Sequence, residues 1–235
     1  MAFELISQNV ARIQERVTAA ARRAGRRPEE ITLIGVSKTH PGEAIRAAYD
    51  AGLRHFGENR VQEWEGKQSL VGDLNAVFHL IGHLQSNKAA RAAKLFQSVD
   101  SVDDFPLAQR LARFHVESNR TAELRILIEV HIGDEQSKSG ISPAELPVLA
   151  KDICNLSGTH LAGLMCIPPF FENAEKARPY FLRLRTLRDE LAKRLRCELP
   201  VLSMGMSHDF EVAIEEGATE VRIGTAIFGT REAIK

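Results

Sequence analysis

The chain has 235 residues, and its 31 Lys and Arg are balanced by 31 Asp and Glu, so the formal net charge at pH 7 is zero. A neutral chain has no overall field that would attract nucleic acid or an anionic membrane. The sequence has no apolar run as long as a transmembrane helix, and the N-terminus lacks the apolar core of a secretory signal. Its three cysteines form no C-x-x-C pair, which argues against a disulfide framework or a zinc knuckle. We therefore expect a cytoplasmic protein that binds neither nucleic acid nor membrane.

A helix opens the chain, and strands alternate with helices after it. Val10, Ile13 and Val17 recur at helical spacing within residues 4–24. The next segment, ITLIGVSK, is an apolar, β-branched run typical of a parallel strand that is covered on both faces. Seven further strand-like runs follow, each with a helical pattern after it. The eight predicted strands span residues 31–38, 53–57, 76–82, 95–101, 123–132, 160–167, 199–205 and 219–224.

This alternation predicts an α/β protein with a parallel sheet. Eight strand–helix units without a Pro/Gly/Ser-rich linker between them favour a single (β/α)8 TIM barrel over residues 1–235, with an extra N-terminal helix. The alternative is an open, doubly wound sheet. It is less favoured because the first strand is followed by VSKTH (36–40) and not by the G-x-G-x-x-G loop of a dinucleotide-binding fold.

In a TIM barrel the chemistry lies at the C-terminal ends of the strands, and polar residues gather there in this sequence. Lys38 closes the first strand, where apolar walls around its stem would favour the neutral amine and permit a Schiff base. The alternative is a lysine that only extends from the rim into water. The other polar segments at predicted strand ends are 58–59, 79, 83–87, 137–139, 166–169, 203–207 and 222–225.

Ser207, Gly224 and Thr225 form a second group at the ends of the last two strands. Ser207 leads into a helix expected from His208, and Gly224–Thr225 precede a short turn, so free N–H groups and hydroxyls would face the pocket. TIM barrels often bind phosphate after strands seven and eight. The structural alternative is that Ser207 caps its helix and Gly224 lets the chain turn.

A Schiff-base lysine facing a phosphate site is compatible with two ligands, pyridoxal 5′-phosphate (PLP) or a sugar phosphate bound by an aldolase. The position of Arg222 bears on the choice between these two ligands. Beside the pyridine nitrogen of PLP, its guanidinium would disfavour protonation of that nitrogen and weaken the ring as an electron sink. Otherwise Arg222 forms a salt bridge within the barrel. Asn59 either bonds a ligand or caps the next helix. His79 and His83 have helical ligand spacing but straddle a strand end, so no metal site is expected.

Six segments then make the chain similar to a known family. They are GVSKTHP (35–41), HFGENRVQE (55–63), FHLIGHLQSNK (78–88), SKSGI (137–141), GLMCIP (163–168) and LSMGMSHDFEVAIEEGATEVRIGTAIFG (202–229). The chain resembles the PLP homeostasis proteins, the YggS or PROSC family, almost end to end. His83 departs from the family, which usually has proline there.

The resemblance implies a barrel like the N-terminal domain of alanine racemase, with PLP as the cofactor. It implies that Lys38 holds PLP as an internal aldimine and that Asn59 lies near the cofactor. It also implies that Arg222 faces the ring nitrogen. The phosphate would be held by Ser207, Gly224 and Thr225.

The resemblance further implies a carrier or regulator in intracellular PLP homeostasis, without robust catalysis. Racemisation needs an acid and a base on opposite faces of the substrate, and the only tyrosines, Tyr49 and Tyr180, lie in helical patterns away from the predicted strand ends. The alternative is a PLP-dependent amino-acid racemase or lyase with weak activity. Apo PLP-dependent enzymes are possible partners. We expect a monomer, because racemase dimers depend on a second domain that this chain lacks.

Overall fold

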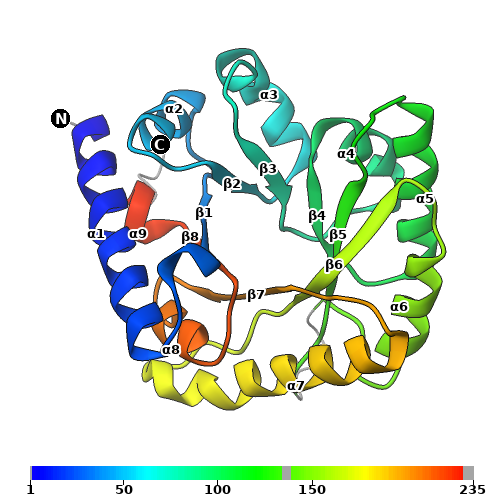
Figure 1. Cartoon of the computed structure of the whole chain (residues 1–235). Coiled ribbons are helices and arrows are strands. Elements are labelled where there is room, and N and C mark those ends of the chain that lie inside the picture. Colours follow the sequence, from blue (N-terminus) through cyan, green and yellow to red (C-terminus); the bar gives the residue numbers. More distant parts are fainter. Residues whose placement is uncertain (1, 134–138, 230–235) are drawn as a thin grey trace.

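Eight parallel strands close into a barrel in the order β1 to β8 in the computed structural model, which describes residues 2–133 and 139–229 (Figure 1). Each strand pairs with its neighbours in sequence, and β8 pairs back onto β1. The predicted TIM barrel is therefore confirmed. Residues 137 and 138 of the predicted mouth lie outside the described ranges. The strands are β1 Thr32–Val36, β2 His55–Glu58, β3 Val77–Leu80, β4 Ser98–Val102, β5 Leu124–Glu129, β6 Thr159–Met165, β7 Val201–Met206 and β8 Glu220–Ile223.

A helix follows every strand, and the predicted extra helix, α1, precedes them all. The α-helices are α1 Ala2–Arg23, α2 Gly42–Asp50, α3 Val61–Val71, α4 Ala89–Leu95, α5 Phe105–Glu117, α6 Leu146–Cys154, α7 Arg178–Leu195, α8 Phe210–Glu215 and α9 Thr225–Phe228. Three 3-10 turns, η1 Pro28–Glu30, η2 Ser86–Lys88 and η3 Ala174–Ala177, precede β1, α4 and α7. Among the described residues, no helix is long and apolar enough to cross a bilayer.

Several predicted strands are longer than the observed ones. The fourth was expected over 95–101 but begins at Ser98, because α4 continues to Leu95. The fifth was expected to reach residue 132 but ends at Glu129, beyond which Val130 makes only an isolated bridge with Ile141. An apolar run marks a buried segment, but pairing with the neighbouring strands decides where the ladder stops.

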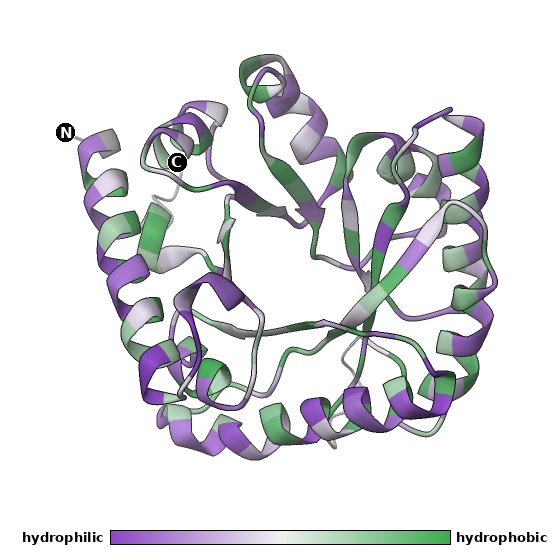
Figure 2. Cartoon of the chain, viewed as in Figure 1, coloured by the Kyte–Doolittle hydropathy of each residue, from purple (hydrophilic) through white to green (hydrophobic). Residues whose placement is uncertain are grey.

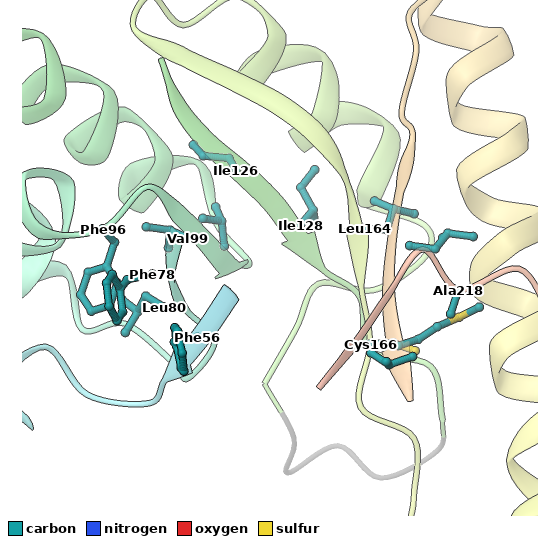
Figure 3. Packing of buried hydrophobic residues seen from close by; sticks show 14 of the residues in the cluster. Phe56, Phe78, Leu80, Phe96, Val99, Ile126, Ile128, Leu164, Cys166 and Ala218 are labelled. Carbon is teal, nitrogen blue, oxygen red and sulfur yellow. The ribbon is translucent and has the colours of Figure 1, made fainter. Parts of the chain in front are cut away.

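Apolar side chains fill the layer between the barrel and its helices. Phe78 on β3 stacks on Trp64 of α3 with ring centroids 3.9 Å apart, and on Phe56 of β2 at 5.7 Å. Figure 3 shows Phe56, Phe78 and Phe96 gathered with Leu80 on one side of the barrel. The helices carry hydrophilic and hydrophobic stripes, as Figure 2 shows, because only one face of each meets the strands.

The barrel interior, in contrast, contains charged and polar side chains. Arg125 on β5 lies 2.6 Å from Glu220 on β8, and since these strands are not neighbours, the contact crosses the interior. His79 lies 3.0 Å from Asp100 and 3.0 Å from His55 through its two ring nitrogens. These groups lie toward the N-terminal end of the barrel, because His55 and Glu220 are the first residues of their strands.

Helix α1 is bonded to α9, the short helix that follows β8. Its buried face carries Val10 and Ile13, and the Asn9 side chain donates to the carbonyl of Ile227 in α9 at 2.9 Å. Both residues are buried. Since α9 follows directly after β8, this hydrogen bond joins α1 to the segment that begins at residues 224–225.

Replacing Asn9 by Ala should destabilise the fold. The Ile227 carbonyl would be left buried without its donor, which costs about 1–3 kcal/mol. Urea denaturation of Asn9→Ala beside Gln8→Ala, an exposed neighbour on the same helix, measures the difference. Equal unfolding midpoints for the two variants would show that Asn9 does not fasten α9.

Candidate functional site

The ends of β1 and β8 bring Lys38 and Gly224–Thr225 together. Ile34 and Gly35 pair with Arg222 and Ile223, and a Cβ on Gly224 would lie 3.4 Å from the Val36 carbonyl oxygen. The half-buried Lys38 follows Val36 by two residues.

The loop that carries Lys38 also contacts α9 directly. His40 stacks on Phe228 with ring centroids 5.2 Å apart. The predicted lysine and one half of the predicted phosphate site therefore lie on adjacent strand ends, joined by this ring contact.

Ser207 completes the group from the other side of β8. Met206 pairs with Arg222, so the residue after Met206 leaves the barrel beside the end of β8. The structural alternative for Ser207 is wrong, because α8 begins at Phe210 and not at His208, and its N-cap is Asp209. The Asp209 carboxylate accepts from the Met206 N–H at 2.7 Å, which leaves the Ser207 hydroxyl out of the cap.

The donors in this group suit an oxyanion. Gly224 is the N-cap of α9 and Thr225 is its first residue, and the first N–H groups of a helical turn have no acceptor within it. The Thr225 side chain is exposed and the Ser207 side chain is half-buried. Two hydroxyls and unpaired backbone N–H groups can bond phosphate oxygens, and a Cβ at position 224 would be in van der Waals contact with Val36 of β1.

Arg222 forms part of the floor of the mouth. It is buried, and it donates to the Ser203 hydroxyl at 2.8 Å and to the Cys166 carbonyl at 2.9 Å. Within the described part of the chain, the alternative of a salt bridge within the barrel is not found, because the Ser203 hydroxyl and the Cys166 carbonyl are both neutral. The guanidinium is thus held at the strand ends by neutral groups.

Glu129, the last residue of β5, was missed in the sequence. It is 5 % exposed, and burial raises the pKa of its carboxyl to about 7, although Arg222 lowers that pKa and Asp103 raises it further. A carboxyl with a pKa near neutrality can hold or release a proton at the mouth. The sequence does contain a sign of this residue, because a glutamate ends the segment RILIE, but such an apolar run by itself indicates only a strand.

The turn at Lys38 is supported from outside the barrel by a buried ion pair, which the sequence did not indicate. Lys67 of α3 donates to Glu58 at 2.8 Å and to the Ser37 carbonyl at 2.9 Å, and the Ser37 hydroxyl donates to Glu58 at 2.7 Å. Burial raises the pKa of the Glu58 carboxyl, although the ammonium group of Lys67 lowers it. Ser37 is therefore held by both its carbonyl and its side chain.

Thr39 makes this turn conformationally demanding. Its φ is 66°, a left-handed value that a β-branched residue rarely adopts. The Thr39 N–H donates to the Glu63 carboxylate of α3. Strain of this kind persists only where the surroundings enforce it and is common at functional sites.

Asn59 lies at the end of β2 beside the loop that follows β3. It does not cap α3, whose N-cap is Arg60. A Cβ on Gly82 would lie 2.5 Å from the Asn59 carbonyl oxygen, so the two loops are in close contact. Asn59 also lines a pocket between these two loops.

His79 and His83 lie in different environments, and so do the two tyrosines, Tyr49 and Tyr180. His79 is fully buried in the barrel, whereas the side chain of His83 is 55 % exposed and lies 3.7 Å from Asp103. Tyr49 packs under Arg54 on the outside of the barrel. Tyr180 lies in a helix as expected, in the first turn of α7, and its ring is 3.7 Å from the Cβ position of Gly133 in the loop after β5.

Three buried ligand-type residues, His79, Asp100 and Glu220, have donor atoms within 4.8 Å of one another. Arg125 already supplies a positive charge there, 2.6 Å from Glu220 and 3.8 Å from Asp100. The cluster also lies at the opposite end of the barrel from Lys38. Its geometry is that of an internal ion-pair network.

Comparison with known proteins agrees with this geometry. Residues 8–232 match the family model of the alanine racemase N-terminal domain. The pyridoxal phosphate homeostasis protein of Aquifex aeolicus is 45 % identical over 225 residues, which cover 96 % of this chain and 98 % of that protein. The protein of the same name from Pseudomonas aeruginosa is 46 % identical over 232 residues, 97 % and 96 % of the two chains. PipY of Synechococcus elongatus, solved with PLP bound, is 38 % identical, with a TM-score of 0.84 over 95 % of this chain and all of PipY.

Replacing Glu129 by Gln should remove a pH dependence of stability. Because the pKa of Glu129 is raised from 4.5 to about 7 in the folded protein, the folded state binds more protons than the unfolded chain between these values. Stability therefore falls as pH rises through this window, by up to about 3 kcal/mol from this group. Urea denaturation of Glu129→Gln and wild type from pH 4.5 to 8 measures it, with the exposed Glu117→Gln as control. Parallel stability curves for all three proteins would contradict the raised pKa.

Proposed function

Since the chain belongs to the pyridoxal phosphate homeostasis protein family, we propose that it binds PLP and acts as a carrier or regulator of this cofactor in the cell, without robust catalysis. The observation that carries the proposal is the position of Lys38 beside Gly224–Thr225, on the adjoining ends of β1 and β8. An amine and an oxyanion site so placed suit the aldehyde and the phosphate of one PLP molecule.

In this proposal Lys38 condenses with the PLP aldehyde, so that an imine forms and water leaves. The phosphate is bound by Ser207, Gly224 and Thr225, and Asn59 lies near the cofactor. When bound, PLP supplies an electron-withdrawing ring to amino acids that displace the lysine. The buried hydrogen bonds of Ser37 and the left-handed backbone conformation of Thr39 fix the turn that holds Lys38 in place for this bond.

Arg222 limits the chemistry of the cofactor. Its guanidinium is held by Ser203 and Cys166, and a permanent cation near the pyridine nitrogen opposes protonation of that nitrogen. An unprotonated ring is a weak electron sink. Slow or absent turnover is therefore expected, which suits a protein that protects a reactive aldehyde and passes it on.

We propose further that residues 1–235 form one PLP-binding domain, active as a cytoplasmic monomer. The closed barrel leaves β1 and β8 paired with each other, so no strand edge is offered to a second copy by the described barrel. Apo PLP-dependent enzymes are the proposed recipients of the cofactor.

Replacing Lys38 by Ala should abolish the aldimine absorbance band of the PLP-loaded protein and leave only the absorbance of the PLP aldehyde, because the Schiff base is lost while the phosphate site remains. Spectra of wild type, Lys38→Ala and the exposed Lys94→Ala, recorded after addition of PLP, measure this. Borohydride reduction and peptide mapping should place the modified lysine at position 38. An unchanged band in Lys38→Ala, or no band in wild type, would overturn the proposed site.

The position of Tyr180 near the loops after β5 and β6 favours one alternative, an amino-acid racemase or lyase with weak activity. Tyr180 would be the second acid or base opposite Lys38. NMR of amino acids in D₂O with the PLP-loaded protein distinguishes the two functions. The carrier predicts α-deuterium exchange no faster than with free PLP. Rapid exchange that both Lys38→Ala and Tyr180→Phe abolish would establish the alternative instead.

A further inference from the structure

A cavity of 340 Å³ lies between the loops that follow β2 and β3, next to the mouth of the barrel. We call it the rim cavity. Its volume is within the range of small-molecule sites. It is lined by Asn59, Arg60, Val61, Gln62, Leu80, Gly82, His83, Leu84, Gln85 and Lys88.

The charged groups of the rim cavity are all basic. Arg60, Lys88 and, when protonated, His83 contribute positive charge, and no carboxylate is among the lining residues. The chain as a whole has equal numbers of acidic and basic residues. The excess of positive charge is therefore local and does not follow from composition.

The carboxylates around the rim cavity are already engaged elsewhere. Glu65 pairs with Arg91 at 2.9 Å, and Glu63 accepts from the Thr39 N–H and lies 3.7 Å from Lys67. Asp103 lies 3.7 Å from His83 and accepts from the Gly140 N–H at 3.4 Å. None of them neutralises the other two cations of the cavity.

Arg60 and Lys88 consequently have no ion pair within the described part of the chain. Both cations therefore remain available to an anion in the cavity, whereas some other arginines of the protein are neutralised. Arg178, for example, bonds carboxylates of Glu175, Glu215 and Glu216 at 2.8–2.9 Å. A guanidinium offers a planar fork for two oxygens of one anion, and an ammonium adds a point charge.

The floor of the rim cavity is apolar. Val61, Leu80 and Leu84 are each no more than 3 % exposed, and the close contact of Gly82 with the Asn59 backbone joins the two loops. Gln62 and Gln85, which are both exposed, also line the cavity. An apolar base with basic and amide groups around it recognises an anion that carries a small organic body.

We infer that the rim cavity binds a small organic oxyanion, a carboxylate or a phosphate monoester, through Arg60 and Lys88. This site is separate from the proposed phosphate site at the ends of β7 and β8, and only Asn59 belongs to both the cavity and the proposed cofactor site. The inference goes beyond the proposed function, because the cavity residues other than Asn59 take no part in holding PLP.

Calorimetric titration of the PLP-saturated protein at constant ionic strength tests this site with benzoate, phenyl phosphate and uncharged benzyl alcohol. Both anions should bind saturably at one site and benzyl alcohol should not. Arg60→Gln/Lys88→Gln should weaken anion binding at least tenfold, because both positive charges that bind the anion are removed. Tighter binding of phenyl phosphate would identify a phosphate ester as the ligand class, and tighter binding of benzoate a carboxylate.

Two controls make the result specific. Arg22→Gln/Lys94→Gln removes the same charge from exposed positions outside the cavity and should leave anion affinity unchanged. Ser207→Ala/Thr225→Val alters only the proposed PLP phosphate site and should also leave it unchanged, so the two sites succeed or fail separately. Equal affinity in wild type and Arg60→Gln/Lys88→Gln, no saturable heat, or benzyl alcohol binding as tightly as benzoate would overturn the inference.

Discussion

The pairing of β1 with β8 is the constraint on which the rest of this structure depends. It closes the sheet, and it places the first and last βα loops beside each other although most of the chain separates them. Lys38 and Gly224 are neighbours only for this reason. The contacts around the closure reinforce it from both sides, since His40 stacks on Phe228 and Asn9 of α1 bonds the Ile227 carbonyl. Closure of the barrel and assembly of the site are thus one event.

The barrel separates two kinds of packing. Between strands and helices, aromatic and aliphatic side chains supply the hydrophobic stabilisation, as the stack of Phe56, Phe78 and Trp64 shows. Inside the barrel, ion pairs and hydrogen bonds dominate, from Arg125–Glu220 at one end to Arg222 and Glu129 at the other. Arg125 and Glu220 are compensated by each other across the interior, and Arg222 is satisfied by the Ser203 hydroxyl and the Cys166 carbonyl. Because Arg222 and Glu129 lie at the mouth end of the interior, these buried groups also contribute to the charge of the mouth.

The mouth combines fixed and accessible groups. Ser37 and Arg222 are buried and held by several hydrogen bonds, whereas Thr225 and Arg60 are exposed. Rigid groups position a ligand and exposed ones admit it, which suits a protein that takes up a cofactor and releases it. The rim cavity extends this mouth toward β3, and its charged lining residues are all basic.

The sequence by itself determined the fold class and the candidate residues, because hydrophobic periodicity and residue type are local properties. The eight strands, the leading helix and the positions of Lys38, Asn59, Ser207, Arg222, Gly224 and Thr225 at strand ends could all be predicted in this way. Only the tertiary structure decided what these residues touch. Asp209 caps α8 in place of Ser207, Lys67 turns inward to Glu58, and Tyr180 lies near the mouth because α7 begins there. Glu129 acquires its raised pKa from burial, which outweighs the lowering effect of Arg222 on a strand that is not its neighbour. Glu129 and Arg222, like Tyr180 and Gly133, are distant in the chain, so no local pattern encodes their proximity, and it exists only once the barrel has closed.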